Sequence, residues 1–224
     1  MKITFPHIGD AHLIGRIFFS EIGIEIVTPG ANTLKGLETG SGVSPDEICI
    51  PFKLMVANLM EAYRLGADTV IMPATMGPCR LGEYGELLKS ILDSRGYLFQ
   101  WILLDSSEAI GKRELLRRLA HVVSDSDKGK AQILRALFGT YQVIKALERL
   151  DQRAHILAGY ERSKGDCKKE VTACRRELGD ASGIREAVRI IRNHLDRLEK
   201  VELDYDKKPL HLLLTGEIFS MIEP

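Results

Sequence analysis

Two cysteines occupy positions at which a thiolate could do chemistry. Cys49 lies in SPDEICIPFK, directly before a helix that Pro51 is expected to begin, and Cys79 lies in MGPCRLGEYG, between a buried strand and the next helix. Unpaired backbone N–H groups and the positive end of the helix dipole favour an anionic sulfur at such sites. Thiolates bind metals, and iron–sulfur clusters in particular take thiolate ligands. A shared metal is therefore one interpretation of the pair, and two separate small core residues are the other.

The sequence around these cysteines narrows the chemistry only in part. Cys49 and Cys79 are far apart in the sequence and match no compact signature, since the chain has no CxxC motif. Lys53 follows Cys49 by about one helical turn, and Arg80 follows Cys79 directly. Lys53 and Arg80 have two interpretations. In the first, they offset the negative charge of a thiolate cluster or hold a carboxylate or phosphate. In the second, they are solvated charges at helix ends.

The remaining cysteines and two histidines carry weaker signals. Cys167 and Cys174 lie on one face of a charged helical segment, about 10 Å apart by helix rise, which is too far for a disulfide. They are predicted to be ordinary helix residues. His7 and His12 with Asp10 resemble a divalent-metal set, but a strand-to-helix turn followed by a helix is the stronger interpretation, and the aspartate would equally cap that helix.

Several common catalytic motifs are missing from the sequence. It contains no Walker P-loop, no GxSxG and no GxGxxG. The stretch TLKGLETGSGVSPDEIC, residues 33–49, is predicted to be a long functional loop. A further alternative is that Cys79 acts as a nucleophile. No base lies near it in the sequence, and His7 is the only candidate base by fold position.

The elements that must position these cysteines alternate between strand and helix in the first half of the chain. Strands are expected at 2–6, 23–29, 67–74 and 97–104, and helices at 11–22, 51–66 and 82–95. Such alternation implies βαβ crossovers and a parallel sheet covered on both faces. The loops at the carboxyl ends of its strands form the ligand crevice, where Cys49 and Cys79 both fall. Residues 1–105 are therefore predicted to be a Rossmann-like α/β unit.

The second half of the chain has a different pattern. Residues 106–205 repeat apolar residues at helical spacing and are predicted to form a helical subdomain or a long insertion. In residues 206–224, the run LHLLL is expected to be the first strand of a second, incomplete α/β unit. We therefore expect the chain to be a fragment, or a subunit completed by another polypeptide.

The composition is that of an ordinary globular protein, with 45% hydrophobic and 28% charged residues. Lys+Arg and Asp+Glu both number 31, and the lack of a basic excess argues against a general nucleic-acid binder. The N-terminal stretch lacks the apolar region of a signal peptide, and no stretch approaches a membrane span. The cytoplasm is therefore expected, where cysteines are more often thiols or ligands than disulfides.

Four blocks of the sequence are informative when taken together: TFPHIGDAH, SPDEICIPFKL, GADTVIMPATMGPCRLGEYGELL and LTGEIFSMIEP. They resemble proteins related to the 2-hydroxyacyl-CoA dehydratases, and most closely the component-D-like family. The resemblance covers roughly residues 1–105 and 207–224, and the cysteine-containing blocks are its specific part. It implies Rossmann-like α/β units with helical elaborations and a gene often near, or fused to, an ATP-dependent activator.

The resemblance also implies a cofactor and partners. Dehydratase subunits hold a [4Fe–4S] cluster through three cysteines and receive a low-potential electron from the activator, which enables radical removal of water from a 2-hydroxyacyl-CoA. Cys49 and Cys79 match the first two cluster cysteines. The third normally lies in a Cys-x-Pro-Glu block of the second α/β unit, and this sequence has no such block. A missing segment or a partner subunit would supply it.

Two function classes follow from these observations. The first is an iron–sulfur redox component of an acyl-CoA dehydratase or reductase system, with the activator and an acyl-CoA as partners and neither nucleic acid nor a membrane. The second is a non-catalytic scaffold or interaction subunit, homo- or hetero-oligomeric, in which the cysteines pack in the core. In that case the helical middle presents a surface to a partner.

Overall fold

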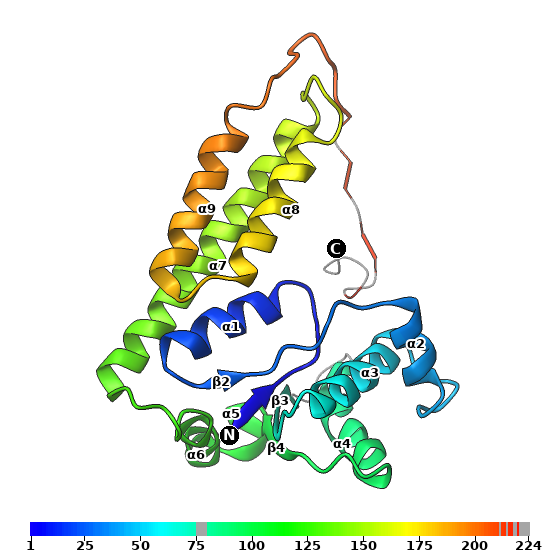
Figure 1. Ribbon diagram of the computed structural model, residues 1–224. Helices are drawn as coiled ribbons and strands as arrows, with labels where there is room; N and C mark the ends of the chain where they lie inside the picture. The colour runs from blue at the N-terminus through cyan, green and yellow to red at the C-terminus, as the bar shows by residue number, and fades with distance from the viewer. Residues whose placement is uncertain (75–79, 211, 214, 217–218, 220–224) are drawn as a thin grey trace. The chain divides into compact units, whose positions relative to one another are not determined.

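The computed structural model of the chain divides into two compact units (Figure 1). It describes residues 1–74, 80–210, 212–213, 215–216 and 219. Among these, unit 1 comprises Met1–His12 and Gly23–Asp127, and unit 2 comprises Leu13–Ile22 and the chain from Lys128 onward. The chain therefore leaves unit 1 early, contributes one helix to unit 2 and returns. The change from one unit to the other falls at 127/128, later than the predicted boundary at 105/106.

Unit 1 is built on a four-stranded sheet with the strand order β2-β1-β3-β4. The strands are β1 Lys2–Thr4, β2 Glu25–Ile26, β3 Thr69–Pro73 and β4 Gln100–Leu104. All neighbouring strands are parallel, and the longest pairing joins β3 to β4 along their whole length. The prediction of a mixed α/β protein with a parallel sheet is confirmed. Because the strands are parallel, their carboxyl ends share one edge, which we call the carboxyl edge.

The helices of unit 1 are α2 Leu34–Ser41, α3 Ile50–Arg64, the 3-10 turn η1 Arg80–Glu83, α4 Tyr84–Ser94, α5 Ser107–Ile110 and α6 Lys112–Val122. Of these, α3 and α4 begin and end near the residues that the sequence predicts. Pro51 lies in the first turn of α3, and Gly66 follows its end with a positive φ of 94°. Gly96 does the same after α4, with φ 82°. A left-handed residue is the usual helix terminator, and glycine adopts it without strain.

The helix α2 corrects the prediction of a long loop over residues 33–49. Thr33 caps this helix by accepting a hydrogen bond from the Gly36 backbone N–H at 3.0 Å. The helix packs so closely on α3 that a Cβ atom at Gly40 would lie 1.8 Å from the backbone oxygen of Lys53. Gly36 and Gly40 are thus residues inside a helix, and at Gly40 the lack of a side chain permits close helix packing.

The core of unit 1 lies around α3, which is buried over most of its surface. Its fully buried side chains include Phe52, Met55 and Leu59, and they join Val70 and Met72 from β3. Three residues of α4 complete this cluster: Tyr84, Leu88 and Leu92. The α3 helix therefore depends on α4 and β3 for its position, and so does the residue at its N-terminus.

Unit 2 consists of α1 Ala11–Glu21, α7 Lys130–Ala158, α8 Asp166–Gly179 and α9 Ile184–Leu198. The helical character predicted for this part of the chain is confirmed. Its core combines Leu13 and Ile17 of α1 with apolar residues of the three later helices. The amphipathic face of α1 is therefore buried in unit 2, although α1 is also the predicted crossover connection between the neighbouring parallel strands β1 and β2.

The strand expected at LHLLL is not found where the structure describes this run. Leu210, Leu212 and Leu213 belong to no strand and are 85%, 79% and 89% exposed, while positions 211 and 214 lie outside the described residues. An apolar run predicts a strand only if another strand lies beside it, which the sequence alone does not show.

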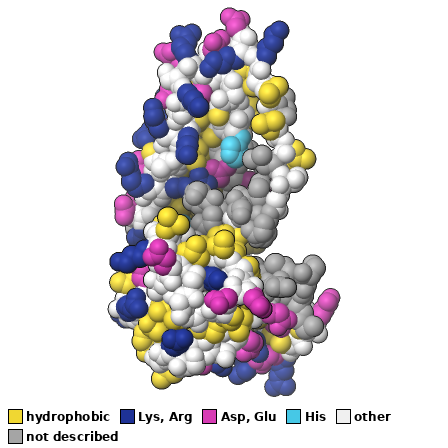
Figure 2. Space-filling model, turned by 90° about the vertical axis from the view of Figure 1, so that its right-hand side faces the viewer, with side chains coloured by type: hydrophobic (Ala, Val, Ile, Leu, Met, Phe, Trp, Pro, Cys, Tyr) yellow, Lys and Arg dark blue, Asp and Glu magenta, His cyan; other side chains and the backbone are white. Residues whose placement is uncertain are grey.

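Charge and hydropathy over the described residues agree with the composition. The face drawn in Figure 2 carries both acidic and basic side chains. None of the helices that the structure describes is at once long enough and apolar enough to cross a membrane.

Candidate functional site

Cys49 lies at the carboxyl edge of unit 1, where α3 begins. It is the N-cap residue of α3, and its backbone oxygen accepts a hydrogen bond from the Phe52 N–H at 3.1 Å. The side chain is half-buried and forms no disulfide. Its sulfur is hydrogen-bonded to the hydroxyl group of Tyr84, the first residue of α4. The positive end of the α3 dipole and this hydroxyl both act on the sulfur.

Tyr84 joins the starts of two helices. Its ring is 5% exposed and packs edge-to-face on Phe52, with ring centroids 5.0 Å apart and an interplanar angle of 81°. Edge-to-face pairs of this kind add to the stabilisation that burial itself provides. Tyr84 therefore holds the start of α4 against Cys49.

Cys79 lies outside the described residues, and so does the side chain of Arg80. The backbone of Arg80 begins the η1 turn, which leads directly into Tyr84. The structure thus brings Cys49 to the helix that follows Cys79 in the chain.

Lys53 has a structural contact on the loop before Cys49. Its ammonium group donates a hydrogen bond to the backbone oxygen of Asp46 at 3.1 Å. This bond ties the loop at residues 44–48 to the first turn of α3. The charge-tuning role predicted for Lys53 remains a prediction beside this contact.

Cys167 and Cys174, which the sequence predicts to be ordinary helix residues, lie in α8 and belong to the core of unit 2. They are 1% and 0% exposed, and burial raises the pKa of each thiol to about 12, with the Glu161 carboxylate contributing at Cys167. A thiol held neutral in this way is a poor metal ligand. Among the cysteines that the structure describes, Cys49 alone has the setting of a thiolate ligand.

No three His, Cys, Asp or Glu side chains come together as a metal-binding group within the described part of the chain. The set His7, Asp10 and His12 is therefore not such a group. His12 lies in α1 and stacks on His7, with ring centroids 4.0 Å apart, and its Nδ1 lies 2.8 Å from the backbone oxygen of Gly9. The interpretation as a turn followed by a helix is confirmed.

His7 nevertheless has an unusual environment at the carboxyl end of β1. Its backbone N–H donates to the side-chain oxygen of Asn58 at 2.9 Å, and its backbone oxygen accepts from Asn32 at 3.4 Å. The amide of Asn58 donates in turn to Asn32 at 3.2 Å. The two asparagines therefore clamp the backbone of His7 in place.

The imidazole of His7 retains one unmet hydrogen-bonding group. The side chain is 6% exposed, and no described residue is a hydrogen-bond partner of its Nδ1 atom. Leaving such a group unpaired costs about 1–3 kcal/mol. His7 is thus a candidate site residue. Asn58 was not predicted from the sequence. Its position inside the apolar run LMVANLM could have indicated a buried amide that needs hydrogen-bond partners.

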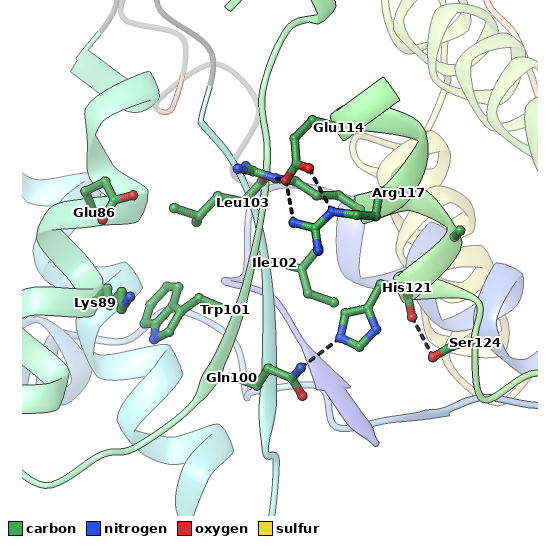
Figure 3. Close-up of a pocket in the computed structure, with 12 residues that line it drawn as sticks. Glu86, Lys89, Gln100, Trp101, Ile102, Leu103, Glu114, Arg117, His121 and Ser124 are labelled. Carbon is green, nitrogen blue, oxygen red and sulfur yellow. Dashed lines mark hydrogen bonds and ion pairs between the residues drawn. The ribbon is translucent and has the colours of Figure 1, made fainter. Parts of the chain in front are cut away.

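A concave region lies beside β4, between α4 and α6 (Figure 3). It is a trough of about 660 Å³ with Lys89 on one wall and His121 on the other. Glu114 forms ion pairs with Arg117 and Arg118, and these hydrogen bonds lower the pKa of its carboxyl group to about 2. The two arginines are therefore already paired within the trough.

The trough lies along the outer side of β4, which is an edge strand that pairs only with β3 in the described sheet. The Nη1 of Arg118 donates to the backbone oxygen of Leu103 at 2.5 Å. This contact occupies an edge carbonyl that another strand would need, and charged side chains commonly protect sheet edges in this way. The trough is a polar surface feature along β4, and none of the described cysteines lines it, so the region around Cys49 remains the stronger candidate site.

Comparisons of the chain with protein-family models, curated proteins and solved structures found no match. The class of protein that the described geometry defines is a mixed α/β protein with a parallel sheet and a cysteine at its carboxyl edge.

Proposed function

We propose that this chain is an iron–sulfur redox protein functionally related to the 2-hydroxyacyl-CoA dehydratases, with Cys49 and Cys79 as cluster ligands. The observation that carries the proposal is the setting of Cys49. It is a half-buried free thiol at the N-terminus of α3, and it contacts the first residue of the helix that follows Cys79. A [4Fe–4S] cluster at this place would accept low-potential electrons for dehydration or reduction of an acyl-CoA.

The strand order supports a ligand site at this edge. In the order β2-β1-β3-β4, the chain leaves β1 toward one side of the sheet and β3 toward the other. Doubly wound α/β folds bind their ligands at such a switch point, outside the carboxyl ends of the strands. We assign unit 1 to this Rossmann-like class, in which His7 follows one strand at the switch point and Cys79 follows the other.

The described residues would act on the ligand sulfur in three ways. The α3 dipole stabilises the negative charge of a Cys49 thiolate. The Tyr84 hydroxyl then donates to that sulfur, and hydrogen bonds to cluster sulfurs are one of the means by which proteins set reduction potential. The packed rings of Phe52 and Tyr84 limit the access of water. In the proposed arrangement a third thiolate comes from another segment or a partner subunit.

The proposal includes the wider system. The electron donor would be an ATP-dependent activator, and the reaction would take place in the cytoplasm. When bound, the cluster supplies the one-electron chemistry, and this chain contributes the fixed position and charge environment of its ligands.

Anaerobic reconstitution of the full chain with iron, sulfide and a small thiol tests the proposal. Iron and acid-labile sulfide analysis with EPR is expected to detect a cluster in the wild type, and Cys49→Ser and Cys79→Ser are each expected to lose most of it. Cys174→Ser is the matched control, since it removes a buried thiol of unit 2 and should retain the wild-type iron content. The proposal fails if the wild type and a Cys49→Ser/Cys79→Ser variant hold equally little iron.

The second candidate function is that of an interaction subunit. It is favoured by a line of exposed apolar side chains on α7, including Leu134, Leu137 and Tyr141. This alternative would be supported if the wild type binds no iron after reconstitution and the Cys49→Ser/Cys79→Ser variant assembles as the wild type does.

A further inference from the structure

Figure 1 shows the long helix α7 of unit 2. Its exposed and buried apolar side chains form two separate faces. One face is buried in the core of unit 2 and includes Val143, Leu147 and Leu150. The other, which we call the α7 stripe, is exposed. It consists of Leu134, Leu137, Phe138, Tyr141 and Ile144, which are 59%, 50%, 69%, 55% and 43% exposed. A helix at the surface of a single core needs only one apolar stripe.

The spacing of the α7 stripe is that of a helix–helix seam. Leu134, Leu137, Tyr141 and Ile144 follow one another at intervals of three, four and three residues, and Phe138 borders this line. Apolar residues that alternate between such intervals repeat every 3.5 residues on average, which is the heptad pattern of coiled coils. The stripe is therefore built to receive another helix along its length.

We propose that the α7 stripe is a dimerisation surface, on which the α7 helix of a second copy of this chain packs antiparallel about a two-fold axis. The sequence of the stripe is self-complementary about position 139. Leu134 and Ile144 are equally distant from this position, and so are Leu137 and Tyr141. Two-fold pairing thus places Leu134 beside the partner's Ile144 and Leu137 beside the partner's Tyr141. A two-fold interface requires such a self-complementary patch, whereas an unrelated partner does not.

The charges at the two ends of the seam obey the same symmetry. Lys130 precedes Leu134 by four residues and Glu148 follows Ile144 by four, so each lies on the line of the seam. Antiparallel pairing places Lys130 beside the partner's Glu148 at both ends. Parallel pairing in register would instead place like charges together. Exposed charges of this kind select orientation more than they add affinity.

The dimer is expected to be weak and dependent on concentration. The seam extends for about 15 Å between Leu134 and Ile144, at 1.5 Å per residue. A patch of this length buries less than the roughly 800 Å² per partner of a standard stable interface. The inference concerns unit 2 alone and does not rest on the function proposed for Cys49, so iron-free protein serves for its test.

Sedimentation equilibrium of the full chain between about 1 and 300 µM tests the surface. The wild type is expected to show a reversible monomer–dimer equilibrium, and Leu137→Glu/Tyr141→Glu is expected to raise the dissociation constant at least tenfold. Leu116→Glu is the matched control, because Leu116 is a 66% exposed leucine on α6. It should leave the equilibrium unchanged, and circular dichroism should show all variants folded. A monomeric wild type, or a dimer insensitive to Leu137→Glu/Tyr141→Glu, would overturn the proposal.

Charge reversal tests the antiparallel orientation. Lys130→Glu and Glu148→Lys are each expected to weaken the dimer severalfold, since each places like charges together. The combined variant is expected to recover wild-type association. In a parallel, in-register dimer neither single reversal changes the pairing of like charges, so an absence of weakening and recovery would overturn the antiparallel arrangement. Glu148→Lys also removes the ion pair between Lys145 and Glu148 within α7, whose atoms are 3.1 Å apart in the wild type. The helix content of each variant is therefore measured as well, so that a loss of helix is not mistaken for a loss of dimer.

Discussion

Cys49 in unit 1 and Cys174 in unit 2 show how position determines the chemistry of one residue type. Cys49 precedes the first turn of α3, is half-buried and contacts a tyrosine hydroxyl. Cys174 lies in the interior of α8, is 0% exposed, and burial raises the pKa of its thiol to about 12. The edge of a parallel sheet offers helix ends and solvent access, whereas the core of a helical unit offers neither. Ligand chemistry is therefore expected in unit 1 and packing or assembly in unit 2.

The same contrast applies to helix glycines and gives the largest expected effect. A Cβ atom at Gly40 in unit 1 would lie 1.8 Å from the backbone oxygen of Lys53, while at Gly139 in unit 2 it would approach the Ile184 side chain at 2.9 Å. The backbone of Lys53 cannot move away from an added methyl group as easily as the side chain of Ile184 can. Gly40→Ala is expected to lower the free energy of unfolding by about 2–4 kcal/mol, whereas Gly139→Ala should cost less than about 1.5 kcal/mol because helix propensity partly offsets the crowding.

Urea unfolding followed by circular dichroism measures both variants. Gly36→Ala provides a control within α2, since a Cβ atom there meets no atom closer than 3.4 Å. Equal losses for Gly40→Ala and Gly36→Ala would mean that the α2–α3 packing is looser than described.

Replacement of the two thiols by hydroxyls is expected to have an intermediate effect. Cys174→Ser places a hydroxyl in an apolar core and should lower the free energy of unfolding by about 1–3 kcal/mol. Cys49→Ser should cost less than about 1 kcal/mol, because a serine at an N-cap accepts a backbone hydrogen bond well. Guanidinium unfolding of both variants makes the comparison. A larger loss for Cys49→Ser would identify Cys49 as a core residue and would favour the scaffold interpretation.

The last expected effect is absent at neutral pH and concerns the stability of unit 2 in the alkaline range. The folded-state pKa of Cys167 and Cys174 is raised to about 12, so the folded protein keeps protons that the unfolded chain releases at a lower pH. The free energy of unfolding should therefore fall as the pH rises from about 9 to 12, by at most about 1.4 kcal/mol per pH unit for each thiol. The difference between the wild type and Cys167→Ala/Cys174→Ala over this range isolates the contribution. Parallel pH profiles for the two proteins would contradict it.

Local signals in the sequence predicted much of unit 1. Pro51 and Gly66 mark the ends of α3, and the apolar run before position 74 marks β3, so the location of Cys49 at a helix start could be predicted. Thr33 is a usable N-cap signal for α2, but Gly36 and Gly40 suggest a loop when their packing role is unknown. Propensity describes a residue within its own segment and says nothing of the segment packed against it.

Contacts between distant segments account for what the sequence did not predict. The amphipathic face of α1 carries Leu13 and Ile17, and nothing in those residues indicates that their neighbours come from α7–α9. The clamp of Asn32 and Asn58 on His7 likewise joins three separate segments. On α7, periodicity predicts the helix but does not separate the buried face from the exposed one.

The early departure of the chain into unit 2 also affects its synthesis. The helix α1 ends at Glu21, and its core partners are complete only when α9 ends at Leu198. At about 5–20 residues per second, the ribosome needs roughly 9 to 35 seconds to cover that distance. Until α7, α8 and α9 have all been made, Leu13 and Ile17 of α1 lack part of their folded-state core. We therefore expect the growing chain to bind chaperones that recognise apolar segments at the ribosome exit.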